Sequence, residues 1–173
     1  MSSGSKVLAL LAASAVMLFA SFSTAQAVEF SWEVDYLGED CVNRSPSVTP
    51  YYFSGAIGNP STTAWLELDC PMSRAAQFDS GTVDVIDQNG YTGYDVSCSH
   101  VGVHWNYNTA TYYTGGSRAS SGAGTQKQTL YFNGIANAPW PTMYYYSCII
   151  PPAYGGAKAK SYIEIYTLSE PNP

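Results

Sequence analysis

Charged residues are scarce in this sequence, and basic residues are the scarcest. Lys and Arg number 7 against 13 Asp and Glu, and charged residues make up 12% of the 173-residue chain, about half the usual share. The basic residues form no cluster, so the chain lacks the positive patch that binds nucleic acid or anionic membranes. We expect neither as a partner.

The motifs of common active sites are also missing. The chain contains no G-x-S-x-G sequence for a nucleophilic serine and no C-x-x-C pair for zinc. Its two histidines, His100 and His104, lie in a segment that predicts a strand, where four residues span about 13 Å, too far to share an ion. We expect both to face solvent. No pair of carboxylates is singled out for glycoside hydrolysis, so the sequence predicts a protein that is not an enzyme and needs no cofactor.

Calcium is the one metal that the sequence leaves open. The segment 79–95 is rich in oxygen ligands: Asp79, Asp84, Asp87, Asn89 and Asp95. Their order fits no EF-hand loop, and turns are commonly acidic for other reasons. No metal ligand is assigned.

The N-terminal segment contains no acidic residue and has the pattern of a targeting segment. Lys6 precedes an apolar run that ends near residue 22, and AQA at 25–27 is a small-x-small cleavage signal. This layout is typical of a secretory signal peptide over residues 1–27, with an apolar core too short for a good membrane span. The remaining domain, 28–173, would have 173 − 27 = 146 residues and a net charge of 6 − 13 = −7. We expect a secreted or periplasmic single-domain protein without membrane insertion after cleavage.

Four cysteines follow the signal segment: Cys41, Cys70, Cys98 and Cys148. An even number in an exported chain predicts two disulfides. Three connectivities are possible. The pairing Cys41–Cys70 with Cys98–Cys148 is favoured because it closes the shorter loops.

Period-two alternation of apolar and polar residues predicts strands, while sustained helical periodicity is absent. The alternation is clear in three segments: VEFSWEVDY (28–36), TAWLELDC (63–70) and SHVGVHWNY (99–107). Further strands are expected at 50–57, 81–87, 93–98, 126–132, 143–150 and 160–168.

Turn signals separate these strands. QNG at 88–90 predicts a hairpin, GGSRASSGAG at 115–124 predicts a mobile loop, and only 72–78 is compatible with a helical turn. Many short strands between Gly, Pro and Asn turns indicate an all-β fold. The sequence therefore predicts a single-domain antiparallel β-sandwich with two disulfides.

The tyrosine triplet in MYYYSCII (143–150) is expected to be mainly structural. Strand alternation places Tyr144 and Tyr146 on the same face as Cys148 and leaves Tyr145 on the other. A structural disulfide is expected between the two sheets, so the Cys148 face should point into the core. At most Tyr145 is then exposed and able to contact a ligand.

Several segments carry a resemblance: 51–71, 95–98, 125–132, 144–152 and 161–170, together with the order of the four cysteines. In these the chain resembles small exported four-cysteine proteins of unknown function from Gram-negative bacteria, chiefly myxobacteria and their relatives. The resemblance implies an exported, disulfide-bonded, β-rich domain. It transfers no catalytic or binding residues.

Aromatic residues that alternation does not bury are the candidates for binding: Trp65, Tyr112, Tyr113 and Trp140. Trp65 lies on a polar strand face, Tyr112 and Tyr113 are expected in a loop, and Trp140 stands between two prolines. Such rings stack on sugar faces.

We predict first an exported, non-catalytic protein with a structural or surface-matrix role outside the cell membrane. The alternative is a glycan-binding module that uses these four aromatic residues, and an extracellular protein is a further candidate partner. The sequence predicts no oligomeric state.

Overall fold

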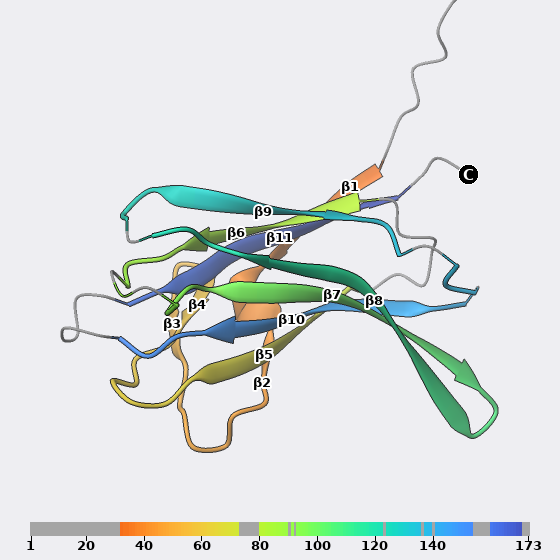
Figure 1. The fold of residues 1–173 in the computed structure, drawn as a ribbon, viewed down its shortest axis with the longest axis horizontal. Coiled ribbons are helices and arrows are strands. Elements are labelled where there is room, and N and C mark those ends of the chain that lie inside the picture. Colours follow the sequence, from red (N-terminus) through yellow and green to blue (C-terminus); the bar gives the residue numbers. More distant parts are fainter. Residues whose placement is uncertain are drawn as a thin grey trace, which may run out of the picture.

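The computed structural model describes residues 32–72, 80–89, 91, 93–122, 124–135, 137–139, 141–153 and 160–170. In these residues the chain folds into two antiparallel sheets that stack face to face (Figure 1). The one helix of this part is a short 3-10 turn, η1 (Gly38–Asp40). The predicted all-β sandwich with two disulfides is confirmed. The expected signal peptide at 1–27, and nearly all of the expected helical turn at 72–78, lie outside the described residues.

One layer is a six-stranded sheet built around its longest strand, β11, which pairs with β1, β4 and β6. The short strand β3 continues the sheet from β4, and β9 ends it beside β6. The strands are β1 (Trp32–Leu37), β3 (Tyr51–Phe53), β4 (Ala56–Gly58), β6 (Ser80–Ile86), β9 (Lys127–Asn133) and β11 (Tyr162–Glu170).

The second layer is a five-stranded sheet in the order β2-β5-β10-β7-β8. Its central strand β10 contains the tyrosine triplet, and β2 and β8 form its two edges. The strands are β2 (Val42–Asn43), β5 (Leu66–Pro71), β7 (Ser97–Asn106), β8 (Thr109–Ala119) and β10 (Met143–Ile150).

Both disulfides have the favoured pairing, Cys41–Cys70 and Cys98–Cys148. Cys98 and Cys148 are direct partners across β7 and β10, and Cys41 immediately precedes β2, which pairs with the strand that holds Cys70. Each bridge therefore joins neighbouring strands of one sheet, and the expectation that a bridge would link the two sheets is wrong. All four cysteines nevertheless lie in the core.

The predicted core face of the tyrosine triplet is confirmed. Tyr146 is fully buried and Tyr144 is 5% exposed, whereas Tyr145 is only half-buried on the other face. The Tyr146 ring packs on Phe132 of the opposite sheet, with ring centroids 4.9 Å apart, and its hydroxyl donates a 3.1 Å hydrogen bond to the Thr167 carbonyl. Burial strongly raises the pKa of the Tyr146 hydroxyl.

His100 is fully buried in this structure, so the expectation that it faces solvent is wrong. Cys98 points into the core, and a residue two positions along the same strand shares its face. The ring of His100 lies near those of Phe132 and Tyr144, with centroids 6.5 Å and 5.6 Å away. Desolvation lowers the pKa of His100 to about 4, and a hydrogen bond with the Asn133 backbone opposes this shift.

The first half of the loop expected at 115–124 belongs to β8, which ends at Ala119, and Gly115 and Gly116 form a bulge within it. The β7–β8 register shifts between Ser99 and Val101, opposite Gly115 and Gly116. Gly116 has φ +94°, and a Cβ on Gly115 would lie 2.8 Å from Nδ1 of His100. Glycine at 115 thus makes room for the buried imidazole.

Two further turn assignments differ from the prediction. The strand expected at 50–57 is a hairpin of β3 and β4, because Ser54 (φ 48°) and Gly55 (φ 85°) form its two-residue turn. The segment 88–90 is no hairpin, because β6 and β7 belong to different sheets.

Candidate functional site

An exposed group of aromatic side chains lies in the two connections that precede β5 and β7, and we call Trp65, Tyr91 and Tyr94 the aromatic platform. Trp65 stacks on Tyr94 with ring centroids 5.3 Å apart and planes 26° from parallel. Tyr91 meets Tyr94 edge-on at 5.9 Å. Trp65 is 39% exposed and Tyr91 is 51% exposed, so solvent reaches two rings of a preformed cluster.

A buried asparagine fixes the connection that carries Trp65. The Asn59 side-chain amide donates hydrogen bonds to the carbonyls of Ala64 (2.8 Å) and Ile150 (3.0 Å), and its side-chain oxygen accepts one from Ser61 N–H (2.9 Å). Asn59 is fully buried. Because these bonds tie the loop to the end of β10, the backbone next to Trp65 has a defined position.

A buried carboxylate fixes the second connection. Asp87 accepts hydrogen bonds from the hydroxyls of Ser120 (2.5 Å) and Ser161 (2.7 Å) and from Asn89 N–H (2.9 Å). Asp87 is fully buried, and a buried carboxylate is tolerated when such bonds are made. The bonds join the start of this loop to Ser120, which follows β8, and to Ser161, which precedes β11.

Asn89 extends this network to the platform itself. Its side-chain amide donates to the Pro152 carbonyl at 2.7 Å, and its side-chain oxygen accepts from Tyr91 N–H at 3.1 Å. Asn89 is 1% exposed. Satisfied buried polar networks rigidify their surroundings, so the platform rings are held in place before any ligand arrives.

Three of the five possible calcium ligands make contacts within the protein. Asp87 and Asn89 belong to the loop network, and Asp84 forms an ion pair with Lys127 at 2.7 Å. Within the described residues, no group of three or more metal-ligating side chains forms. Asp79 lies outside the described residues.

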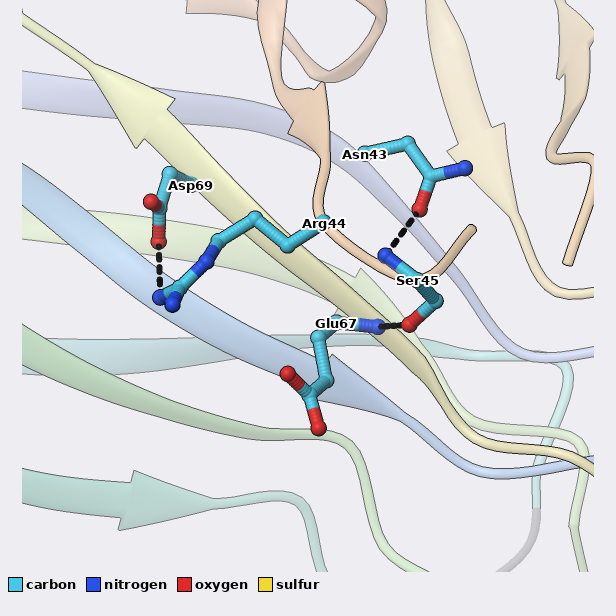
Figure 2. Close-up of polar contacts among 5 residues, drawn as sticks. All are labelled: Asn43, Arg44, Ser45, Glu67 and Asp69. Atoms are coloured by element: carbon cyan, nitrogen blue, oxygen red, sulfur yellow. Dashed lines mark hydrogen bonds and ion pairs between the residues drawn. The ribbon is translucent and has the colours of Figure 1, made fainter. Parts of the chain in front are cut away.

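Polar side chains continue from the platform along the outer face of the five-stranded sheet. Figure 2 shows Arg44 reaching across β5 to Asp69, with 3.4 Å between the guanidinium and the carboxylate. The Ser45 hydroxyl accepts a 2.8 Å hydrogen bond from Glu67 N–H, and the Glu67 carboxylate points away from it (Figure 2). Donors and acceptors for a polar ligand therefore lie beside β5.

A second aromatic region occupies the far end of this face. Tyr145 pairs with Val101, next to Val103, which pairs with Tyr112. Partial burial, followed by the nearby charge of Asp69, raises the pKa of Tyr145. Tyr112 is 64% exposed, so much of its ring is open to solvent on this face.

Of the four aromatic residues singled out from the sequence, the three that the structure describes do not gather in one place. Trp65 is exposed as expected and belongs to the platform. Tyr112 and Tyr113 lie in β8 and not in a loop, and Tyr113 is half-buried on the opposite face. Trp140 lies outside the described residues.

Trp65 and Tyr112 mark opposite ends of the outer sheet face. Pro71, which pairs with Tyr145, lies six positions along the chain from Trp65, a span of about 20 Å. Tyr94 was missed because the segment 93–98 reads as a strand, whereas the strand begins at Ser97. Tyr91, which directly follows the predicted turn at 88–90, was not singled out. The Gly, Asn and Tyr content of 88–94 was the available signal for an aromatic loop.

No protein-family model matches the chain, and no curated protein matches it in sequence. Among solved structures it is similar to a low-affinity xylan binding module from Roseburia intestinalis, with 11% identity, 79% of this chain and 94% of that chain covered, and a TM-score of 0.49. It is also similar to the mannan-recognising module TmCBM27, with 11% identity, coverage of 84% and 100%, and a TM-score of 0.44.

A third similar structure is a family two carbohydrate esterase from Cellvibrio japonicus, with 10% identity and a TM-score of 0.44. The match covers 83% of this chain but only 36% of the esterase, so the chain spans about a third of that protein. At such identities the likeness concerns the β-sandwich architecture alone.

Proposed function

We propose that the protein is an exported, non-catalytic module that binds carbohydrate at the aromatic platform. The observation that carries this proposal is the exposed stack of Trp65 on Tyr94, held by loops with a buried hydrogen-bond network. Aromatic faces bind the apolar faces of sugar rings. A surface fixed in advance loses little conformational entropy on binding.

The polar groups beside the platform suit the hydroxyls of a sugar. The Glu67 and Asp69 carboxylates accept hydrogen bonds from hydroxyl groups, and the Arg44 guanidinium donates them. Glu67 and Arg44 are exposed and Asp69 is half-buried. A carbohydrate stacked on Trp65 would therefore find hydrogen-bonding partners along β5.

Export is supported by the two disulfides, which form and persist in oxidising compartments. In the part of the chain that the structure describes, no helix is long and apolar enough to cross a membrane. We place the protein in the periplasm or outside the cell. Mass spectrometry of exported protein should find Val28 at the N-terminus and no free thiol, whereas an intact Met1 would contradict this location.

Affinity electrophoresis in gels that contain xylan or galactomannan tests the binding proposal. The unaltered protein should migrate more slowly in at least one such gel than in a gel without polysaccharide. Trp65→Ala should abolish this retardation. Tyr131→Ala is the matched control, because Tyr131 is a 69% exposed tyrosine on β9 of the other sheet. Retardation that Trp65→Ala leaves unchanged, or no retardation in either gel, would contradict the proposal.

A structural or surface-matrix role is the second candidate function. The observation that favours it is the long edge strand β8, whose first half carries no charged residue and offers a means of self-association.

A further inference from the structure

Strand β8 ends the five-stranded sheet, and within the described residues it pairs on one side with β7. The outer side of an edge strand presents backbone N–H and C=O groups that can pair with another strand. Figure 1 shows the β7–β8 hairpin extending past the ends of the neighbouring strands. A second strand can therefore approach the tip of β8 without meeting the body of the sandwich.

The first half of β8 lacks the features that usually prevent edge pairing. Residues 109–114 read TATYYT, with no charged residue and no proline, whereas protected edges carry lysine, proline or a bulge. Threonine and tyrosine also favour extended structure. The bulge at Gly115–Gly116 and the charge of Arg118 lie in the second half of the strand.

The other edges are better protected. β2 has two residues and β3 has three, and short edges pair poorly. β9 carries Lys127, which forms an ion pair with Asp84, and β1 carries Glu33 and Asp35. Of the edges that the structure describes, β8 is the longest, with 11 residues against 7 in β9.

The hairpin also exposes three large aromatic rings to solvent. Trp105 is 58% exposed, Tyr112 is 64% exposed, and Tyr107 at the tip is 98% exposed. Tyr107 has φ 54°, a strained conformation for a bulky residue at a turn position that favours Asn or Gly. Strain and exposure both disfavour tyrosine here in a monomer, which points to a contact outside it.

We propose that β8 pairs antiparallel with β8 of a second copy of this chain, so that two five-stranded sheets join into one. A twofold axis through the 109–114 segment would bring the same uncharged surface of each copy together. The whole chain has a formal net charge of −6, so two copies repel each other over most of their surfaces. The β7–β8 hairpin carries no acidic residue, and approach through it avoids that repulsion.

Sedimentation velocity over a wide range of protein concentrations, without carbohydrate and with the disulfides intact, tests this pairing. The unaltered protein should shift from monomer to dimer as its concentration rises. Tyr112→Lys and Thr111→Lys place like charges against each other across the twofold axis, and each should weaken dimerisation by about tenfold or more. The matched control, Tyr131→Lys, makes the same change at a similarly exposed tyrosine on β9 and should leave dimerisation unchanged.

Circular dichroism identifies any variant that fails to fold, and if Tyr112→Lys does, Thr111→Lys decides the question. A protein that stays monomeric at every concentration would overturn the inference. So would a dimer that is weakened by Tyr131→Lys but not by the β8 variants, because it would form through β9. Neither outcome bears on the platform, since the experiment contains no carbohydrate.

Discussion

Replacement of Tyr146 tests the arrangement of the core most directly. The ring is fully buried and packs on Phe132, with centroids 4.9 Å apart, and on Tyr166 at 6.1 Å. Truncation of a buried aromatic ring to alanine usually lowers the free energy of unfolding by about 3–5 kcal/mol, because it removes apolar burial and leaves a cavity. Tyr146→Ala should therefore bring a domain of ordinary stability close to unfolding.

Two related variants separate the contributions to this loss. Tyr146→Phe keeps the ring but removes the 3.1 Å hydrogen bond to the Thr167 carbonyl, and it should cost about 1–2 kcal/mol. Tyr145→Ala changes the adjacent tyrosine, which is half-buried on the outer face, and it should cost clearly less than Tyr146→Ala. Urea denaturation of the three variants with intact disulfides measures these differences. If Tyr145→Ala were the most destabilising, the assignment of the core face of β10 would be refuted.

Three further predictions concern the five-stranded sheet. His100 has a folded pKa of about 4, below its usual 6.5, so the unfolded state binds the proton more tightly. The free energy of unfolding should therefore fall by about 3 kcal/mol as the pH falls from 6.5 to 4. His100→Phe should remove this part of the pH dependence in urea denaturation, and an unchanged pH dependence would contradict the burial of His100. Tyr107→Gly relieves the positive φ and should raise the free energy of unfolding by up to about 1 kcal/mol in thermal or urea melts, whereas destabilisation would show that the ring supports the fold. Gly115→Ala places a Cβ 2.8 Å from the His100 ring and should cost about 1–3 kcal/mol, and a neutral effect would mean that the imidazole can move aside.

The faces of β5 and β10 were predictable because each strand places a cysteine on its apolar side. Cys70 follows Leu66 and Leu68 at period two, and Cys148 precedes Ile150. All of these residues are fully buried. Where composition and disulfide point to the same face, alternation predicts it correctly.

Strand β7 shows why alternation failed for His100. Val101 and Val103 are 8% exposed although they lie on the outer face, where they pair with Tyr145 and Tyr112 of the neighbouring strands. Both faces of β7 are thus shielded, and the apolar residues alone cannot identify the core side. The position of Cys98 identifies the core side of β7, because His100 lies two residues further along the strand and therefore on the same face.

Turn signals predicted where the chain bends but not which strands a bend joins. QNG at 88–90 resembles a hairpin turn, yet the chain crosses there from β6 in one sheet to β7 in the other. Conversely, the true hairpin between β7 and β8 turns at Tyr107 and Asn108, where tyrosine gives a poor local signal. Pairing partners depend on contacts between distant segments, which local composition does not contain.

The site depends on polar residues whose role changes once the fold is known. In the sequence, Asp87 and Asn89 resemble turn residues or calcium ligands. In the structure they are buried and hydrogen-bonded, and with Asn59 they fix the two loops of the platform. Buried polar groups lower stability unless each finds a partner. Shorter apolar connections would therefore stabilise the fold equally well if the loops had no other role. The rings that the loops hold, Trp65 and Tyr91, are partly open to solvent and contribute correspondingly less to the core. Precise placement of such rings has a clear use in recognising a ligand, which is why the platform carries the proposed function and the buried tyrosines do not.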